Sequence, residues 1–276
     1  MHRAVGVPGP GDHAERRFLL PLAGLTGLLL AAFFFVPDVL VRTPVDSDSV
    51  GGAFRRAFVR YWESGSADFA RDLDGIVDFW FRYHLVKAVV SALLLGSAVA
   101  LGTVMRRRGR AVPRSRPLRA ASWTAVGLVG AFALVALMAN VQGAAAPFAS
   151  LLPMLTGGHQ DPALASTLAD VRSRFDGAPG SGAGTPPALA VMTEDFALYH
   201  VVLAGLAAVV TLVLGALTVV LLRRLRRRAP GTSPRALAFA AAGSAVAAAL
   251  TAVLAVANTT NAVHAHQGLA LFFNGG

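Results

Sequence analysis

Five long apolar segments dominate the pattern of hydrophobic and polar positions along the chain. A helix needs about 20 consecutive apolar residues to cross the hydrocarbon core of a bilayer, and each segment is close to this length. The sequence therefore predicts an all-α fold, that of a polytopic membrane protein with five transmembrane helices. The expected spans are residues 18–36, 81–105, 120–141, 196–222 and 236–258.

The first long loop, residues 37–80, is too long to be a simple turn and carries a helical pattern of its own. Phe54, Phe58 and Tyr61 recur at the spacing of one helical face, while the neighbouring arginines point elsewhere. This pattern is typical of an amphipathic helix that lies on the membrane interface. A second short helix is expected over residues 66–79, leading into the second span.

The second long loop, residues 142–195, also carries helix signals. Asp161 followed by Pro162 is typical of a helix start, with aspartate as the N-cap and proline in the first turn. The apolar run 148–155 before this helix is expected to lie against the bilayer surface. The helix should end where the glycine- and proline-rich stretch 177–187 begins, which predicts a flexible linker.

Basic residues are concentrated in three segments that flank the spans. Residues 1–17, 106–119 and 223–235 together hold 16 basic groups and two acidic ones, a net charge of +14. The rest of the chain holds 9 basic and 13 acidic groups, a net charge of −4. Because basic residues near span ends are retained on the cytoplasmic side, we expect a plasma-membrane protein with a cytoplasmic N-terminus. The C-terminal tail, residues 259–276, is then extracytoplasmic.

This distribution also explains the overall net charge of +10. In a soluble chain such basicity suggests a nucleic-acid partner, but here the arginines mark orientation, and no nucleic acid is predicted. Lysine occurs once against 24 arginines, and alanine is abundant, a skew typical of a high-GC, actinobacterial genome. The chain has no cysteine, which excludes disulfides and thiolate metal sites. No cofactor is predicted.

An internal similarity relates the beginnings of two spans. Trp80-Phe81-Arg82-Tyr83-His84 resembles Phe196-Ala197-Leu198-Tyr199-His200, 116 residues later in the chain. A glycine pattern at residues 24–27 likewise resembles residues 127–130. Together they predict a parallel repeat of span, outer loop and span, occurring twice and followed by a fifth span.

Ionisable and amide side chains within the spans cluster in the predicted outer leaflet. Such groups are costly to bury in lipid and are therefore functional candidates by default. In the simpler interpretation they anchor the spans at the interface, and Lys87 reaches water or pairs with an acid at the start of the fourth span. In the alternative interpretation, these side chains contact a ligand or a partner. The residues concerned are Tyr83, His84, Lys87, Asn140, Glu194, Asp195, Tyr199, His200 and Asn258.

Two pairs of histidines are weak candidates for metal ligands. The repeat places His84 and His200 at one depth, where two imidazoles could ligate a single metal or haem iron. His264 and His266 in the tail could bind copper or zinc, although a solvated tail is the simpler interpretation. Neither pair has a third candidate ligand, so no metal site is predicted.

Several strings resemble an uncharacterised family of actinobacterial multi-pass membrane proteins. They include VPDVLVRTPVDSDSVGGAFRRAF, DFWFRYHLVKAV and ANVQGAAAPFASLLPML. The resemblance covers nearly the whole chain, implies no catalytic or binding residues, and brings a label for a supposed twin-arginine signal. Arg16-Arg17 does precede an apolar run, but no small-residue cleavage site follows it. We therefore expect an uncleaved membrane anchor.

No catalytic constellation or phosphate-binding glycine loop occurs, and the inner loops are too short for a cytoplasmic domain. We therefore predict no enzymatic activity. The expected function is that of a scaffold or partner-binding protein acting through its extracytoplasmic loops, with the lipid bilayer and another membrane or cell-envelope protein as partners. Two alternatives are a membrane redox or metal/haem-binding protein that uses His84 and His200, and a small exporter of apolar molecules. The span middles hold only apolar or small residues, which argues against an ion-coupled transporter.

Overall fold

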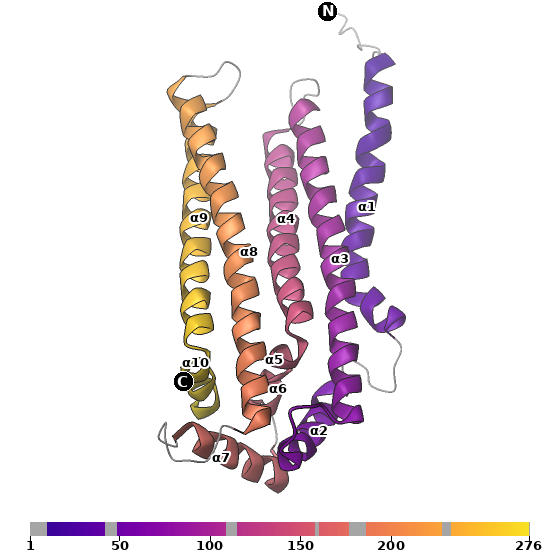
Figure 1. The fold of residues 1–276 in the computed structure, drawn as a ribbon. Helices are drawn as coiled ribbons and strands as arrows, with labels where there is room; N and C mark the ends of the chain where they lie inside the picture. Colours follow the sequence, from indigo (N-terminus) through magenta and orange to yellow (C-terminus); the bar gives the residue numbers. More distant parts are fainter. Residues whose placement is uncertain are drawn as a thin grey trace, which may run out of the picture. The chain divides into compact units, whose positions relative to one another are not determined.

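The computed structural model describes residues 10–41, 49–108, 115–157, 160–176, 186–227 and 233–275, and these are helical with short connections and no strand. The long helices are α1 (Pro10–Leu40), α3 (Arg71–Arg108), α4 (Arg116–Ala145), α8 (Pro187–Arg226) and α9 (Pro234–Val263) (Figure 1). The short ones are α2 (Val50–Ser64), α5 (Pro147–Leu151), α6 (Pro153–Thr156), α7 (Pro162–Asp176) and α10 (Ala265–Asn274).

The predicted fold class is confirmed. Five helices are long and apolar enough to span a membrane, and each expected span falls within one of them. Residues 66–70 of the short helix expected over residues 66–79 are not helical, and residues 71–79 are the beginning of α3, which continues without a break into the span. The linker 177–187, the N-terminal tail and both basic loops lie partly outside the described residues.

The chain divides into two compact units. Unit 1 is built from residues 1–42 and 83–140, with α1 and the span portions of α3 and α4. Thr26 of α1 donates to Ser97 of α3 at 3.2 Å, and both side chains are buried. Phe33 packs with Val90 and Ala136 in a buried cluster, which joins all three helices.

Unit 2 is built from residues 43–82 and 141–276. Its largest element is the antiparallel hairpin of α8 and α9 (Figure 1). Small residues and hydroxyls line this contact: Thr211 bonds Thr251 at 2.8 Å, and Thr218 bonds Ser244 at 2.9 Å. Each threonine hydroxyl also bonds a carbonyl of its own helix, so these polar groups are satisfied within the apolar segment.

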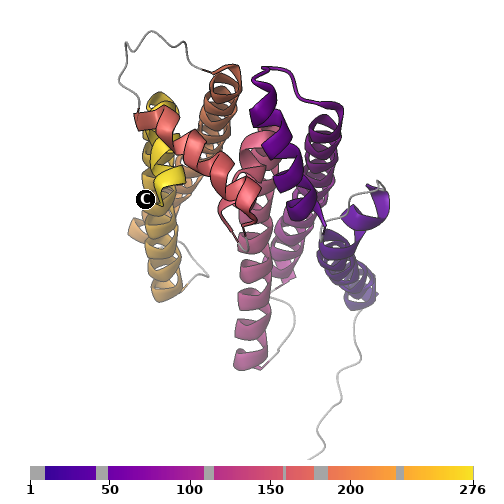
Figure 2. The same cartoon turned by 90° about the horizontal axis from the view of Figure 1, so that it is seen from below.

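At one end of unit 2, short helices form what we call the cap: α2, the first turns of α3 up to residue 82, α5, α6, α7 and α10. Figure 2 shows α7 extending between α10 and α2, and α7 contacts both. Helix α2 ends at Gly65, whose φ of +64° is the left-handed conformation that glycine adopts at least cost. The cap is therefore assembled from three stretches of chain that are far apart in sequence.

Two segments expected at the membrane surface turn apolar side chains into the protein. The aromatic face of α2 is not available to a membrane interface, because Phe54, Phe58 and Tyr61 are fully buried within the protein. The run 148–155 also turns apolar side chains into the protein, since Phe148 packs edge to face against both Phe54 and Tyr61. Two amphipathic segments from different loops have buried their apolar faces against each other, a partner that periodicity alone does not reveal.

Candidate functional site

A hydrogen-bonded histidine–asparagine pair lies in unit 1. His84 Nδ1 is 2.9 Å from Asn140 Oδ1, so the pair joins α3 to α4. Asn140 is buried, and its Nδ2 donates at 2.7 Å to the carbonyl of Ala136, one turn earlier in the same helix. The ring of Tyr83 stands perpendicular to that of His84, with the centroids 6.0 Å apart.

Unit 2 contains the same arrangement in its own hairpin. His200 Nδ1 is 2.7 Å from Asn258 Oδ1, joining α8 to α9. Asn258 is buried, and its Nδ2 donates at 2.8 Å to the carbonyl of Leu254. The ring of Tyr199 again stands perpendicular to the histidine, with the centroids 5.5 Å apart. Four of the residues proposed from sequence thus form two pairs, which the sequence did not indicate.

The asparagine amides determine where each histidine carries its proton. An amide NH₂ must face the carbonyl four residues earlier, because the flipped amide would set two oxygens against each other. The amide oxygen therefore faces the histidine and can only accept a hydrogen bond. In the neutral form of either histidine, Nδ1 then carries the proton and Nε2 is the unprotonated acceptor, the atom that could also ligate a metal.

The expected pairing of Lys87 with an acid at the start of the fourth span stays a prediction, and within unit 1 its ammonium group lies beside two aromatic rings. Its Nζ lies 4.5 Å from the ring centroid of Phe33 and 5.0 Å from that of Tyr83. A cation over an aromatic face is stabilised by the ring quadrupole, increasingly so as it loses water. The acid that acts on it electrostatically is Asp38 of α1. Lys87 therefore binds the second span to the first.

The two acids proposed as its partners behave differently. Asp195 is partly buried, and its carboxylate accepts a hydrogen bond of 2.6 Å from the backbone N–H of Ala149 at the start of α5. Glu194 is exposed. The carbonyl of Tyr199 accepts a hydrogen bond of 3.0 Å from Gln142, so α8 is tied both to α5 and to the end of α4. These contacts position the cap on the hairpin of unit 2.

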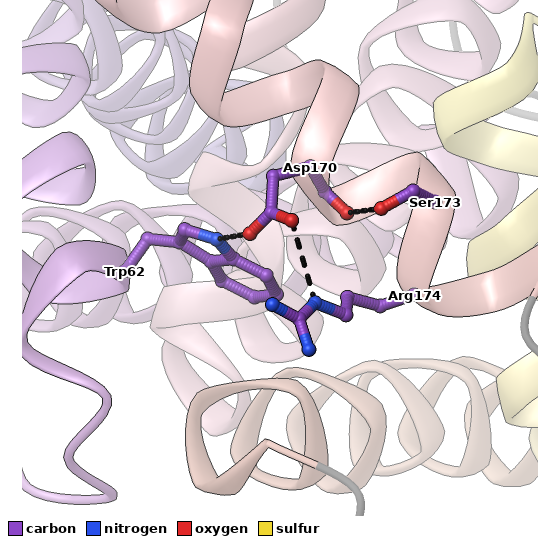
Figure 3. Close-up of polar contacts among 4 residues, drawn as sticks. All are labelled: Trp62, Asp170, Ser173 and Arg174. Carbon is purple, nitrogen blue, oxygen red and sulfur yellow. Dashed lines mark hydrogen bonds and ion pairs between the residues drawn. The ribbon is translucent and has the colours of Figure 1, made fainter. Parts of the chain in front are cut away.

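Polar contacts also hold the cap together, and none of them was predicted. Trp62 Nε1 donates at 2.7 Å to Asp170, whose carboxylate also accepts from Arg174 at 3.4 Å (Figure 3). Arg55 donates to the carbonyls of Met154 and Gly157 at the end of α6. No sequence signal could identify these partners, because Trp62 and Asp170 are 108 residues apart and each belongs to an ordinary amphipathic helix.

The C-terminal tail is packed rather than solvated. Leu269 and Phe273 of α10 are buried, and Arg172 of α7 donates at 2.7 Å to the carbonyl of Phe273. The ring of His266 meets that of Phe175, with the centroids 5.1 Å apart, and His264 lies exposed at the junction of α9 and α10. Among the described residues, no group of three or more histidine, aspartate or glutamate side chains could hold a metal ion.

Tyr61 is the titratable group most affected by the cap core. Its side chain is fully buried, and its hydroxyl has only a long contact of 3.4 Å to the carbonyl of Ala67. Burial, together with the nearby Asp68 carboxylate, raises the pKa of Tyr61 to about 12. The neutral phenol is therefore the form that the folded cap favours.

Comparisons with protein-family models, curated proteins and solved structures found no match to this chain.

Proposed function

We propose that the protein is a non-enzymatic, multi-pass protein of the plasma membrane that binds a protein partner through the extracytoplasmic face of its cap. The observation that supports this proposal is the construction of the cap. Three separate stretches of chain meet through two aromatic clusters, one between α2 and α5 and one between α7 and α10, and through side-chain bonds such as the one from Trp62 to Asp170. Joining two spans requires only a few residues, so a folded assembly of this size exceeds what connection alone needs.

The distribution of basic residues supports an extracytoplasmic position for the cap. The arginines at the end of α8 lie at the opposite end of that helix from its contacts with α5 and α10. If these arginines are cytoplasmic, as their number predicts, the cap is extracytoplasmic. Rigid elements that hold an exposed surface in place are the usual support of binding sites.

Site-specific photocrosslinking in intact cells tests the proposal. A photoreactive residue at exposed positions of α7, Ala165 or Ala169, should give a discrete adduct with one protein. The same residue at lipid-exposed Val213 of α8 should not. Asp170→Ala removes the acceptor of Trp62 and should reduce the adduct, whereas Asp170→Asn retains an amide oxygen in that place and should preserve it. Adducts that are absent, or equally strong at Val213, or unaffected by Asp170→Ala, would contradict the proposal.

The redox alternative would require a cofactor that ligates to His84 or His200. A purified, reconstituted protein without visible absorption would exclude a haem on these histidines, whereas a strong absorption band lost in His200→Phe would replace the proposal with this alternative. No contact among the described residues favours the export of apolar molecules over partner binding.

A further inference from the structure

A cavity of about 370 Å³ opens in unit 2 where α5, α6, α8, α9 and α10 meet. Its volume falls in the range of small-molecule sites, about 300–1,000 Å³. Most of its lining is apolar or aromatic, including Leu152, Phe196, Leu271 and Phe272. The polar positions in the lining are Tyr199, His200 and Asn261, and no lining residue is an acid, a lysine or an arginine.

One hydrogen-bonding atom of this cavity has a defined character. His200 lines the cavity, whereas Asn258, which holds its Nδ1, does not. This leaves the opposite edge of the ring, which carries Nε2, as the edge available to the cavity. Because Asn258 keeps the proton of the neutral ring on Nδ1, Nε2 in that form presents a lone pair, and no described residue donates a hydrogen bond to it. The ring of Phe196, 4.4 Å from that of His200 between centroids, restricts its rotation.

The wall of the cavity depends on one glycine. A Cβ at Gly268 of α10 would come within 3.0 Å of Phe196, so glycine allows the α10 backbone to approach this ring closely. The position of Phe196 therefore depends on the contact between α10 and α8, and with it the width of the cavity.

We propose that this cavity binds a neutral amphiphile, an apolar molecule with a hydroxyl group that donates a hydrogen bond to His200 Nε2. The apolar lining matches the body of such a molecule. An ionised head is disfavoured, because the lining provides no opposite charge to compensate for its loss of water. A molecule with only acceptor groups would leave Nε2 without a donor, which costs binding free energy when the site is desolvated.

Photoaffinity labelling of the whole protein in phosphatidylcholine nanodiscs tests this inference. A photoreactive analogue of decanol should label peptides that contain Phe196 and Leu271, and the labelling should saturate. Decanol, decyl methyl ether and decyl sulfate are then compared as competitors at equal mole fraction in the lipid, which corrects for their different partitioning. Decanol should compete about tenfold better than the other two, the effect of about one hydrogen bond.

Three substitutions locate the effect. His200→Phe should abolish the preference for decanol over the ether, and Gly268→Ala should weaken labelling by displacing Phe196. His266→Ala, on the same helix as Gly268 but outside the lining, should retain the wild-type preference. The inference is overturned if labelling does not saturate, if the ether or the sulfate competes as well as decanol, or if His200→Phe keeps the preference. The competitor series on the wild-type protein decides the question even if His200→Phe fails to fold, and it does not depend on any partner of the cap.

Discussion

At the scale of single residues, the two buried asparagines each serve two purposes. The NH₂ group of Asn258 satisfies a carbonyl of its own helix, and its oxygen fixes the tautomer and orientation of His200 on the neighbouring helix. Asn140 does the same for His84. A buried amide surrounded by apolar residues is costly unless its groups are paired. In the described contacts, both the NH₂ group and the oxygen of each amide have a hydrogen-bond partner. The amides therefore avoid this cost and join two specific helices.

Tyr61 predicts a loss of stability at high pH. Its pKa is about 12 in the folded protein and about 10 in an unfolded chain. The phenol's contribution is fully present below pH 10 and is lost as the pH rises toward 12, because ionisation is easier in the unfolded state. By linkage the loss approaches about 2–3 kcal/mol. Denaturant unfolding at pH 9 to 12 measures it, and Tyr61→Phe should remove this component of the pH dependence. Equal slopes for the two proteins would contradict the assignment.

At the scale of helices, each unit contains a hairpin whose two helices are joined by a histidine–asparagine hydrogen bond. In unit 1 the histidine–asparagine pair joins α3 and α4, and in unit 2 it joins α8 and α9, with asparagines 118 residues apart and histidines 116 apart. The repeat of span, outer loop and span expected from sequence stays a prediction. The contacts favour a different unit, an inner hairpin that occurs twice, because nearly constant offsets for both partners are expected of a duplicated pair.

This equivalence predicts parallel effects of two substitutions. Asn140→Leu and Asn258→Leu should each lower the free energy of unfolding in detergent by about 1 kcal/mol, between the cost of an average interhelical bond in membranes and that of an unpaired buried donor. Thr259→Val is the control, because that exposed hydroxyl bonds only a carbonyl of its own helix. Nitrogen NMR of labelled histidine should show protonated Nδ1 in the wild type and a changed tautomer in each variant. Strongly unequal effects would argue against equivalent hairpins.

How far the sequence predicts an element depends on whether its partner is lipid or protein. The spans follow from length and hydropathy alone, since lipid accepts any apolar surface. The faces of α2 and of the run 148–155 were also recognisable as apolar, but their mutual burial depends on which segments meet. The same holds for Lys87: its place in the second long apolar helix could be predicted from sequence, whereas its contact with Phe33 of α1 depends on helix packing. The cavity beside His200 likewise arises from five helices and has no local signal.

At the scale of the whole molecule, charge and polarity divide the chain into functional parts. The described ends of α3 and α8 away from the cap carry arginines, such as Arg108 and Arg226, and the cap carries the acids of α3. Between them the spans contain hydroxyls that bond helix to helix or to their own carbonyls. The proposed binding activity is assigned to the cap end because folded structure, cavity and polar groups coincide there within unit 2.

The orientation of the whole chain gives the last prediction. A net charge of +14 in the three basic segments against −4 elsewhere predicts that the N-terminus and both basic loops are cytoplasmic, because basic segments resist translocation. Alkaline phosphatase, which is active only outside the cytoplasm, should be active when fused after Gly276 and inactive when inserted at Arg110. Green fluorescent protein at the same sites should give the opposite pattern. Activity at Arg110 together with silence at Gly276 would invert the topology, place the cap inside the cell, and remove the basis for an extracytoplasmic partner.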